Sequence, residues 1–131
     1  MHVDHLGIAV QHLADALPSW EATLSVRGSP PEAVPAQKVN VSFLHAGETH
    51  LELLEPTDPE SAVGRFLAQR GEGLHHVAFL VPEVNAALAA VAERGGRLVD
   101  RVARPGARGR QVGFAHPSAH HGVLVEFVEK A

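Results

Sequence analysis

Two histidines and two glutamates stand at matching places in the two halves of this 131-residue chain, and together they could bind a metal ion. His5 and His76 lie 71 residues apart, each near the start of an apolar segment. Glu52 and Glu126 each lie at the centre of a later apolar segment. Imidazole and carboxylate groups together suit zinc, cobalt, nickel, manganese or iron. If the halves pack with approximate twofold symmetry, these residues predict one metal site.

An internal repeat gives the four residues more weight than any of them has alone. Residues 3–10 align without a gap with residues 74–81, and both segments are typical of buried strands. Residues 51–54 correspond to residues 125–128. A lone buried histidine is more often hydrogen-bonded to backbone than bound to metal, and a glutamate alternating with apolar residues is ordinary in a solvated sheet. Four matched positions favour the metal site.

The elements that must position these residues also occur twice. An amphipathic helix follows each first strand, with apolar residues at i, i+4 and i+7: Leu13, Leu17 and Trp20, then Val84, Leu88 and Val91. Further strands are predicted at 39–44, 50–54, 112–115 and 122–128. Gly95 and Gly96 predict a left-handed end to the second helix. The loop 104–110, which contains two glycines and a proline, is the candidate for a mobile lid.

The composition argues against several classes of protein. Cysteine is absent, which excludes disulfides, thiolate ligands and a cysteine nucleophile. The net charge of -4 and the lack of a basic run argue against nucleic acid as a partner. No apolar stretch approaches the roughly 20 residues that span a bilayer, and the chain opens directly into a strand pattern. We therefore expect a cytoplasmic protein that binds a small-molecule ligand or a protein partner, with no membrane partner.

Five motifs spread over nearly the whole chain carry a family resemblance. They are DHLGIAV at 4–10, LELLEP at 51–56, GEGLHHVAF at 71–79, FAHP at 114–117 and GVLVEF at 122–127. Together they resemble methylmalonyl-CoA epimerases of the vicinal-oxygen-chelate, or glyoxalase, superfamily. The first-strand histidine and last-strand glutamate are shared with glyoxalase I. The double histidine after Gly-Glu-Gly and the His-Pro before the last strand are typical of the epimerases.

The resemblance implies an α+β fold in a single domain over residues 1–131, with two tandem βαβββ modules forming a cupped eight-stranded mixed sheet. The first module covers about 1–56, a connecting helix about 58–71, and the second module about 73–130. It also implies a homodimer. One divalent metal is implied at His5, Glu52, His76 and Glu126, with cobalt expected first and zinc, manganese or nickel as alternatives. His75 precedes a ligand by one position, so its side chain should leave the opposite face of its strand.

The implied activity is that of a metal-dependent isomerase of propionate metabolism. A methylmalonyl-CoA epimerase interconverts the 2R and 2S epimers by proton abstraction at C2, through a metal-stabilised enolate. Glu126 is the first candidate for a proton-transfer base. The second glutamate found in many epimerases corresponds here to Val41, so we expect Glu52 to be the opposite base, with His50 in reserve.

Two arginines are candidates for binding the substrate, and two other functions remain as alternatives. Arg108 and Arg110, in the glycine-containing loop, could meet the phosphates or the free carboxylate of an acyl-CoA, although solvated surface arginines are about equally expected. Ser118 replaces the lysine that often follows His-Pro in related enzymes, which removes one anionic contact. The rivals are glyoxalase I and a non-catalytic protein that binds a small molecule on the same fold.

Overall fold

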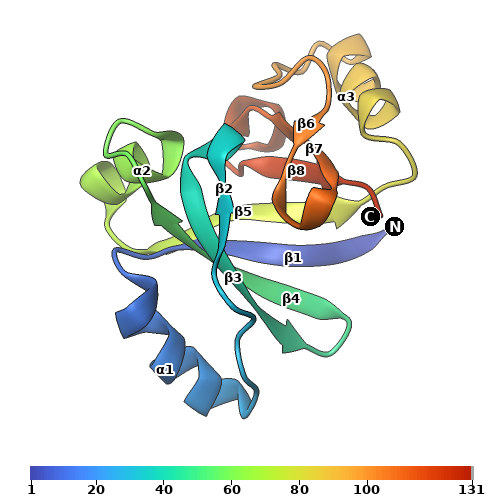
Figure 1. The fold of residues 1–131 in the computed structure, drawn as a ribbon. Coiled ribbons are helices and arrows are strands. Elements are labelled where there is room, and N and C mark those ends of the chain that lie inside the picture. Colours follow the sequence, from blue (N-terminus) through green and yellow to red (C-terminus); the bar gives the residue numbers. More distant parts are fainter. Residues whose placement is uncertain (131) are drawn as a thin grey trace. The chain divides into compact units, whose positions relative to one another are not determined.

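The computed structural model describes residues 1–130, and these contain eight β-strands and three α-helices (Figure 1). The first elements are β1 (His2–Ala9), α1 (Leu13–Leu24), β2 (Glu32–Val34), β3 (Val39–Ala46), β4 (Thr49–Pro56) and α2 (Ala62–Arg70). They are followed by β5 (Gly73–Leu80), α3 (Val84–Glu93), β6 (Arg104–Pro105), β7 (Gln111–Ala115) and β8 (Val125–Val128). Short 3-10 turns lie at Pro35–Gln37, Ala107–Gly109 and Pro117–His120.

The strands follow the order β2-β3-β4-β1-β5-β8-β7-β6 in a mixed sheet. In each module the first strand runs parallel to the last, as β1 does with β4 and β5 with β8. The other paired neighbours within each module are antiparallel. The predicted fold class, two βαβββ modules with an eight-stranded mixed sheet, is confirmed. By its contacts the chain divides into a first unit, residues 5–75, and a second unit, residues 1–4 with the chain from residue 76.

In the first unit, α1 covers one face of β3 and β4. The core on this face is formed by Ile8, Val10, Leu13, Leu44, Leu51 and Leu53. Because side chains alternate along a strand, Leu51 and Leu53 direct Glu52 to the face that α1 does not cover. The apolar pattern of β4 therefore determines where its glutamate points.

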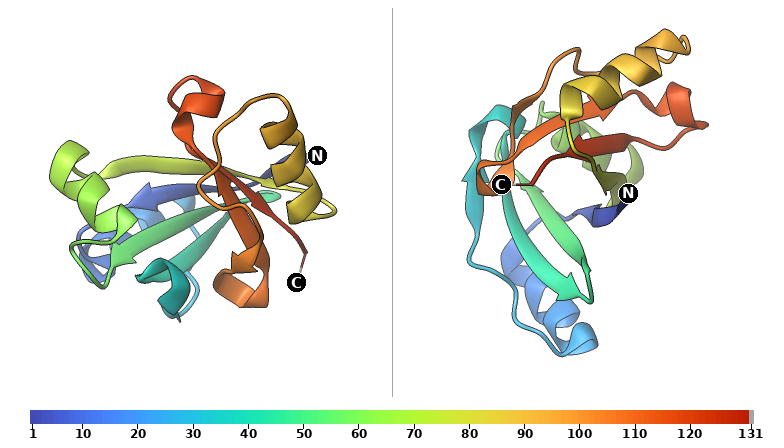
Figure 2. Two further views of the ribbon diagram at one scale, coloured as in Figure 1. Left: turned by 90° about the horizontal axis from the view of Figure 1, so that it is seen from above. Right: turned by 90° about the vertical axis from the view of Figure 1, so that its right-hand side faces the viewer.

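In the second unit, α3 packs on β7 and β8, as the two views of Figure 2 also show. Val125 and Phe127 belong to the core beneath the helix, so Glu126 between them lies on the other face of β8. The helix approaches β7 closely at Gly113, where an added Cβ would lie 2.7 Å from Leu88 Cδ1 and 3.0 Å from Val84 Cγ1. A glycine is needed there to bring the helix this near.

The sequence correctly predicts the end of α3 but not the start of α2. As predicted, α3 ends at a left-handed glycine: Gly95 has φ 82°, and Gly96 N donates to Val91 O at 3.0 Å. In contrast, α2 begins at Ala62 rather than near residue 58, because Ser61 Oγ accepts from Gly64 N at 3.1 Å and caps the helix there. The residues before it form a turn in which Glu60 N donates to Asp58 Oδ1, and this hydrogen bond lowers the pKa of Asp58.

Within residues 1–130, no helix is both long and apolar enough to cross a membrane.

Candidate metal centre

The first candidate pair is His5 on β1 with Glu52 on β4. The two strands are parallel neighbours, and His5 is in register with His50, so Glu52 follows two residues later on the same face. His5 Nε2 lies 3.3 Å from Glu52 Oε1. The sequence places the two residues 47 positions apart, and strand pairing makes them neighbours.

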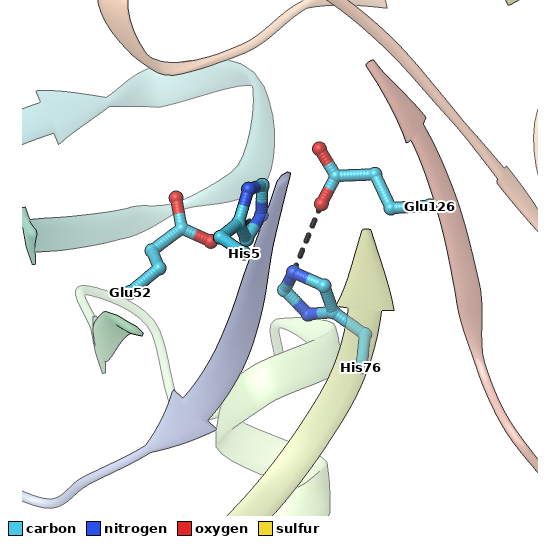
Figure 3. A group of neighbouring side chains, drawn as sticks. All are labelled: His5, Glu52, His76 and Glu126. Carbon is cyan, nitrogen blue, oxygen red and sulfur yellow. Dashed lines mark ion pairs between the residues drawn. The ribbon is translucent and has the colours of Figure 1, made fainter. Parts of the chain in front are cut away.

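The second pair, His76 on β5 with Glu126 on β8, repeats this arrangement. These strands are also parallel neighbours, with Val77 in register with Val125. His76 Nε2 lies 2.9 Å from Glu126 Oε1, the contact drawn as a dashed line in Figure 3. Each module therefore offers one imidazole and one carboxylate in contact with each other.

An aromatic ring accompanies each pair. Phe43 on β3 is in register with Glu52 and meets the His5 ring edge to face, with centroids 6.0 Å apart. Phe114 on β7 is in register with Glu126 and meets the His76 ring in the same way at 5.4 Å. Edge-to-face ring contacts are favourable, so each phenylalanine helps to hold its imidazole in place.

The four side chains are the group within the described residues that could hold a metal ion (Figure 3). One ligand atom of each lies within 4.8 Å of the others, and all four residues are only 3% to 5% exposed. Burying two carboxylates is costly unless cationic partners compensate them. Two imidazole nitrogens and two carboxylate oxygens are a donor set that a divalent transition metal accepts. The residues present therefore fit such an ion.

Comparison with known proteins places the chain in a family. Residues 4–114 match the glyoxalase/bleomycin resistance protein/dioxygenase superfamily. The chain belongs to this superfamily.

The relatives extend this result. The chain is 42% identical over 127 residues to the uncharacterized protein YqjC of Bacillus subtilis, covering 97% of this chain and 91% of that protein. It is 34% identical over 125 residues to the mitochondrial methylmalonyl-CoA epimerase of Bos taurus, covering 95% and 71%. A solved methylmalonyl-CoA epimerase in complex with methylmalonyl-CoA and NH4+ superposes with a TM-score of 0.93 at 37% identity, covering 98% of this chain and 94% of that one. The resemblance to these epimerases is confirmed.

Two other histidines near the candidate ligands have distinct surroundings. His50, half-buried on β4, lies in register with His5 and packs against the rings of Phe43, at 6.2 Å, and His45, at 4.3 Å. His75 meets the ring of Phe66 on α2 at 5.0 Å. His50 thus lies beside a candidate ligand, whereas His75 is directed to a helix.

The two arginines proposed for the substrate differ in their contacts. Arg108 is exposed in the turn Ala107–Gly109, with φ 60°. Arg110 is held by protein groups, since its guanidinium contacts the Asp4 carboxylate and the Glu129 carbonyl oxygen. The segment 104–110, considered as a lid, contains β6, this turn and a Gly106 N to Arg110 O hydrogen bond of 2.8 Å.

The sequence reading missed the two phenylalanines. Phe43 and Phe114 lie 71 residues apart, the same separation as His5 and His76. Extending the repeat from the first strands into the third strands would have found them. The contact of Arg110 with Asp4 had no comparable sequence signal.

Proposed function

We propose that this protein is a methylmalonyl-CoA epimerase. The observation that carries the proposal is the duplicated His–Glu pair, buried in a chain whose relatives include epimerases over nearly its whole length. The superposable complex with methylmalonyl-CoA supports an acyl-CoA as the substrate. The fold alone would not decide the reaction, because one fold hosts several chemistries.

In this proposal, His5, Glu52, His76 and Glu126 bind one divalent ion, with cobalt expected first and zinc, manganese or nickel as alternatives. Four protein ligands leave positions open for substrate oxygens if the ion is octahedral. When bound, the ion would act as a Lewis acid that stabilises negative charge on the thioester and carboxylate oxygens.

The two glutamates also transfer the proton in this proposal. Inversion at C2 requires a base on each face of the substrate, one to remove the proton and one to return a proton to the other face. Glu126 and Glu52 come from different modules, and each is buried against its own histidine. Val41 occupies the third-strand position where many epimerases have glutamate, so that position itself supplies no carboxylate. Glu126 is therefore assigned to one face and Glu52 to the other.

The remaining assignments concern recognition of the substrate. His50 lies in register with His5 on the face that carries Glu52, which makes it a candidate contact for the acyl group or a reserve base. Arg108, exposed in its turn, is the candidate contact for CoA phosphates. The homodimer and the cytoplasmic location stay predictions.

The deciding experiment is incubation of the cobalt-loaded protein with a single epimer of methylmalonyl-CoA in deuterated water. We expect inversion accompanied by uptake of one deuterium at C2, measured by chiral analysis and mass spectrometry. The hemithioacetal of methylglyoxal and glutathione, offered in parallel, should not be isomerised. Absence of both inversion and deuterium uptake would reject the proposal.

A further inference from the structure

Arg110 and Asp4 form a nearly buried, two-pronged ion pair. Arg110 Nη1 lies 3.0 Å from Asp4 Oδ2, and Nη2 lies 2.9 Å from Oδ1. The two side chains are only 12% and 11% exposed. Arg110 Nε also donates to the backbone oxygen of Glu129 at 2.7 Å. All three groups belong to the second unit, so one guanidinium joins three segments of it.

Stability alone is a weak explanation for this pair. Removing two charges from water is costly, and buried ion pairs often stabilise a fold no more than apolar residues of similar volume. The planar guanidinium offers something else, namely a fixed geometry, because its donors match both carboxylate oxygens at once. The pair is therefore suited to holding backbone segments at set positions.

The segments that Arg110 holds are the ones that carry candidate metal ligands. Asp4 immediately precedes His5, and Glu129 follows Glu126 by three residues. Glu129 is itself fixed, since its Oε2 accepts from Val84 N at the start of α3 at 2.7 Å. One guanidinium is thus tied to the chain next to a ligand from each His–Glu pair.

We propose that Arg110 is a positioning residue that sets the backbone of His5 and Glu126 for metal binding, and does not bind the acyl-CoA. This inference rests on the metal site of the proposed function. Groups behind the ligands of a metal site commonly fix ligand orientation in this way.

The test replaces Arg110 by methionine, which keeps an unbranched stem and removes the guanidinium. The dissociation constant for Co²⁺, from competition with a chelator, should rise by about 10- to 100-fold, as for other groups behind metal ligands. The visible spectrum of the Co²⁺ protein should change and kcat should fall, with KM for methylmalonyl-CoA unchanged. Arg110→Lys keeps the positive charge but lacks the paired donors of the guanidinium. It should therefore recover only part of the Co²⁺ affinity that Arg110→Met loses.

Asp4→Asn should also weaken Co²⁺ binding. It removes the ion pair from the other side, and combining it with Arg110→Met should weaken Co²⁺ binding no further than Arg110→Met alone, because both act through one interaction.

Leu88→Ala is the matched control for lost stability. Leu88 lies on α3 in the same unit, is fully buried, and belongs to a core cluster that includes neither the ion pair nor a candidate ligand. This variant should unfold at a lower temperature with unchanged Co²⁺ affinity and spectrum, measured well below its unfolding midpoint.

Two results would overturn the inference. If Arg110→Met loses thermal stability as Leu88→Ala does but keeps the wild-type Co²⁺ constant and spectrum, the pair is only structural. If KM rises while Co²⁺ affinity is unchanged, Arg110 contacts the substrate. If the wild-type protein binds Co²⁺ but does not epimerise methylmalonyl-CoA, the proposed function is rejected and the Arg110 experiment remains valid. If the wild-type protein does not bind Co²⁺, the proposed function and the role of Arg110 are both rejected.

Discussion

Glu126 and Glu52 are chemically alike, and each is assigned as the base on one face of the substrate. Each is buried and contacts the histidine of its own pair, at 2.9 Å for Glu126 and 3.3 Å for Glu52. Replacing either by glutamine preserves shape and an oxygen that can still bind metal, but it removes the base. We expect kcat for inversion to fall by about 10²- to 10⁴-fold in both variants, with the bound metal retained.

Solvent exchange separates the roles of these two glutamates. Each variant should still exchange the C2 proton of one epimer with deuterium, because the remaining base serves that face without completing inversion. The two variants should differ in which epimer they exchange. Near-normal inversion by Glu52→Gln would remove Glu52 from the mechanism, and metal analysis of each variant is the necessary control.

Among the elements, the contact of α3 with β7 depends on the absence of a side chain at Gly113. Gly113→Ala places a methyl group against Leu88 and Val84, so we expect a loss of about 1–3 kcal/mol in the free energy of unfolding. Denaturant unfolding measures this loss. Since the added methyl faces the helix and Glu126 lies on the other face of the sheet, Co²⁺ affinity should not change.

A double variant checks the cause of that loss. In the Leu88→Ala background, Gly113→Ala should cost less, because the shortened side chain leaves room for the methyl group. An equal cost in both backgrounds would show that the backbone at Gly113, rather than crowding by Leu88, determines the effect.

Local patterns predicted most of the elements, and long-range contacts account for what they missed. The stripe Val84, Leu88 and Val91 and the glycines after it correctly located α3, since both signals lie within one helix. The start of α2 was misplaced because several residues there have capping ability, and Ser61 forms the cap. The partner of Arg110 could not be predicted, since Asp4 lies 106 residues away and the repeat pairs Asp4 with His75 rather than with Arg110.

At the scale of the whole molecule, the proposed ion would be bound by both His–Glu pairs, so stoichiometry and stability should be coupled. We expect one Co²⁺ per chain, and at 100 times its dissociation constant the ion should add about 2.7 kcal/mol to the free energy of unfolding. Glu126→Ala or Glu52→Ala alone should abolish most of this gain, because each leaves an incomplete ligand set. Calorimetric unfolding against Co²⁺ concentration, with chelator-treated protein as the reference, measures it. Two ions per chain, with each alanine variant losing only one, would mean that the pairs bind metal independently and that no shared site forms.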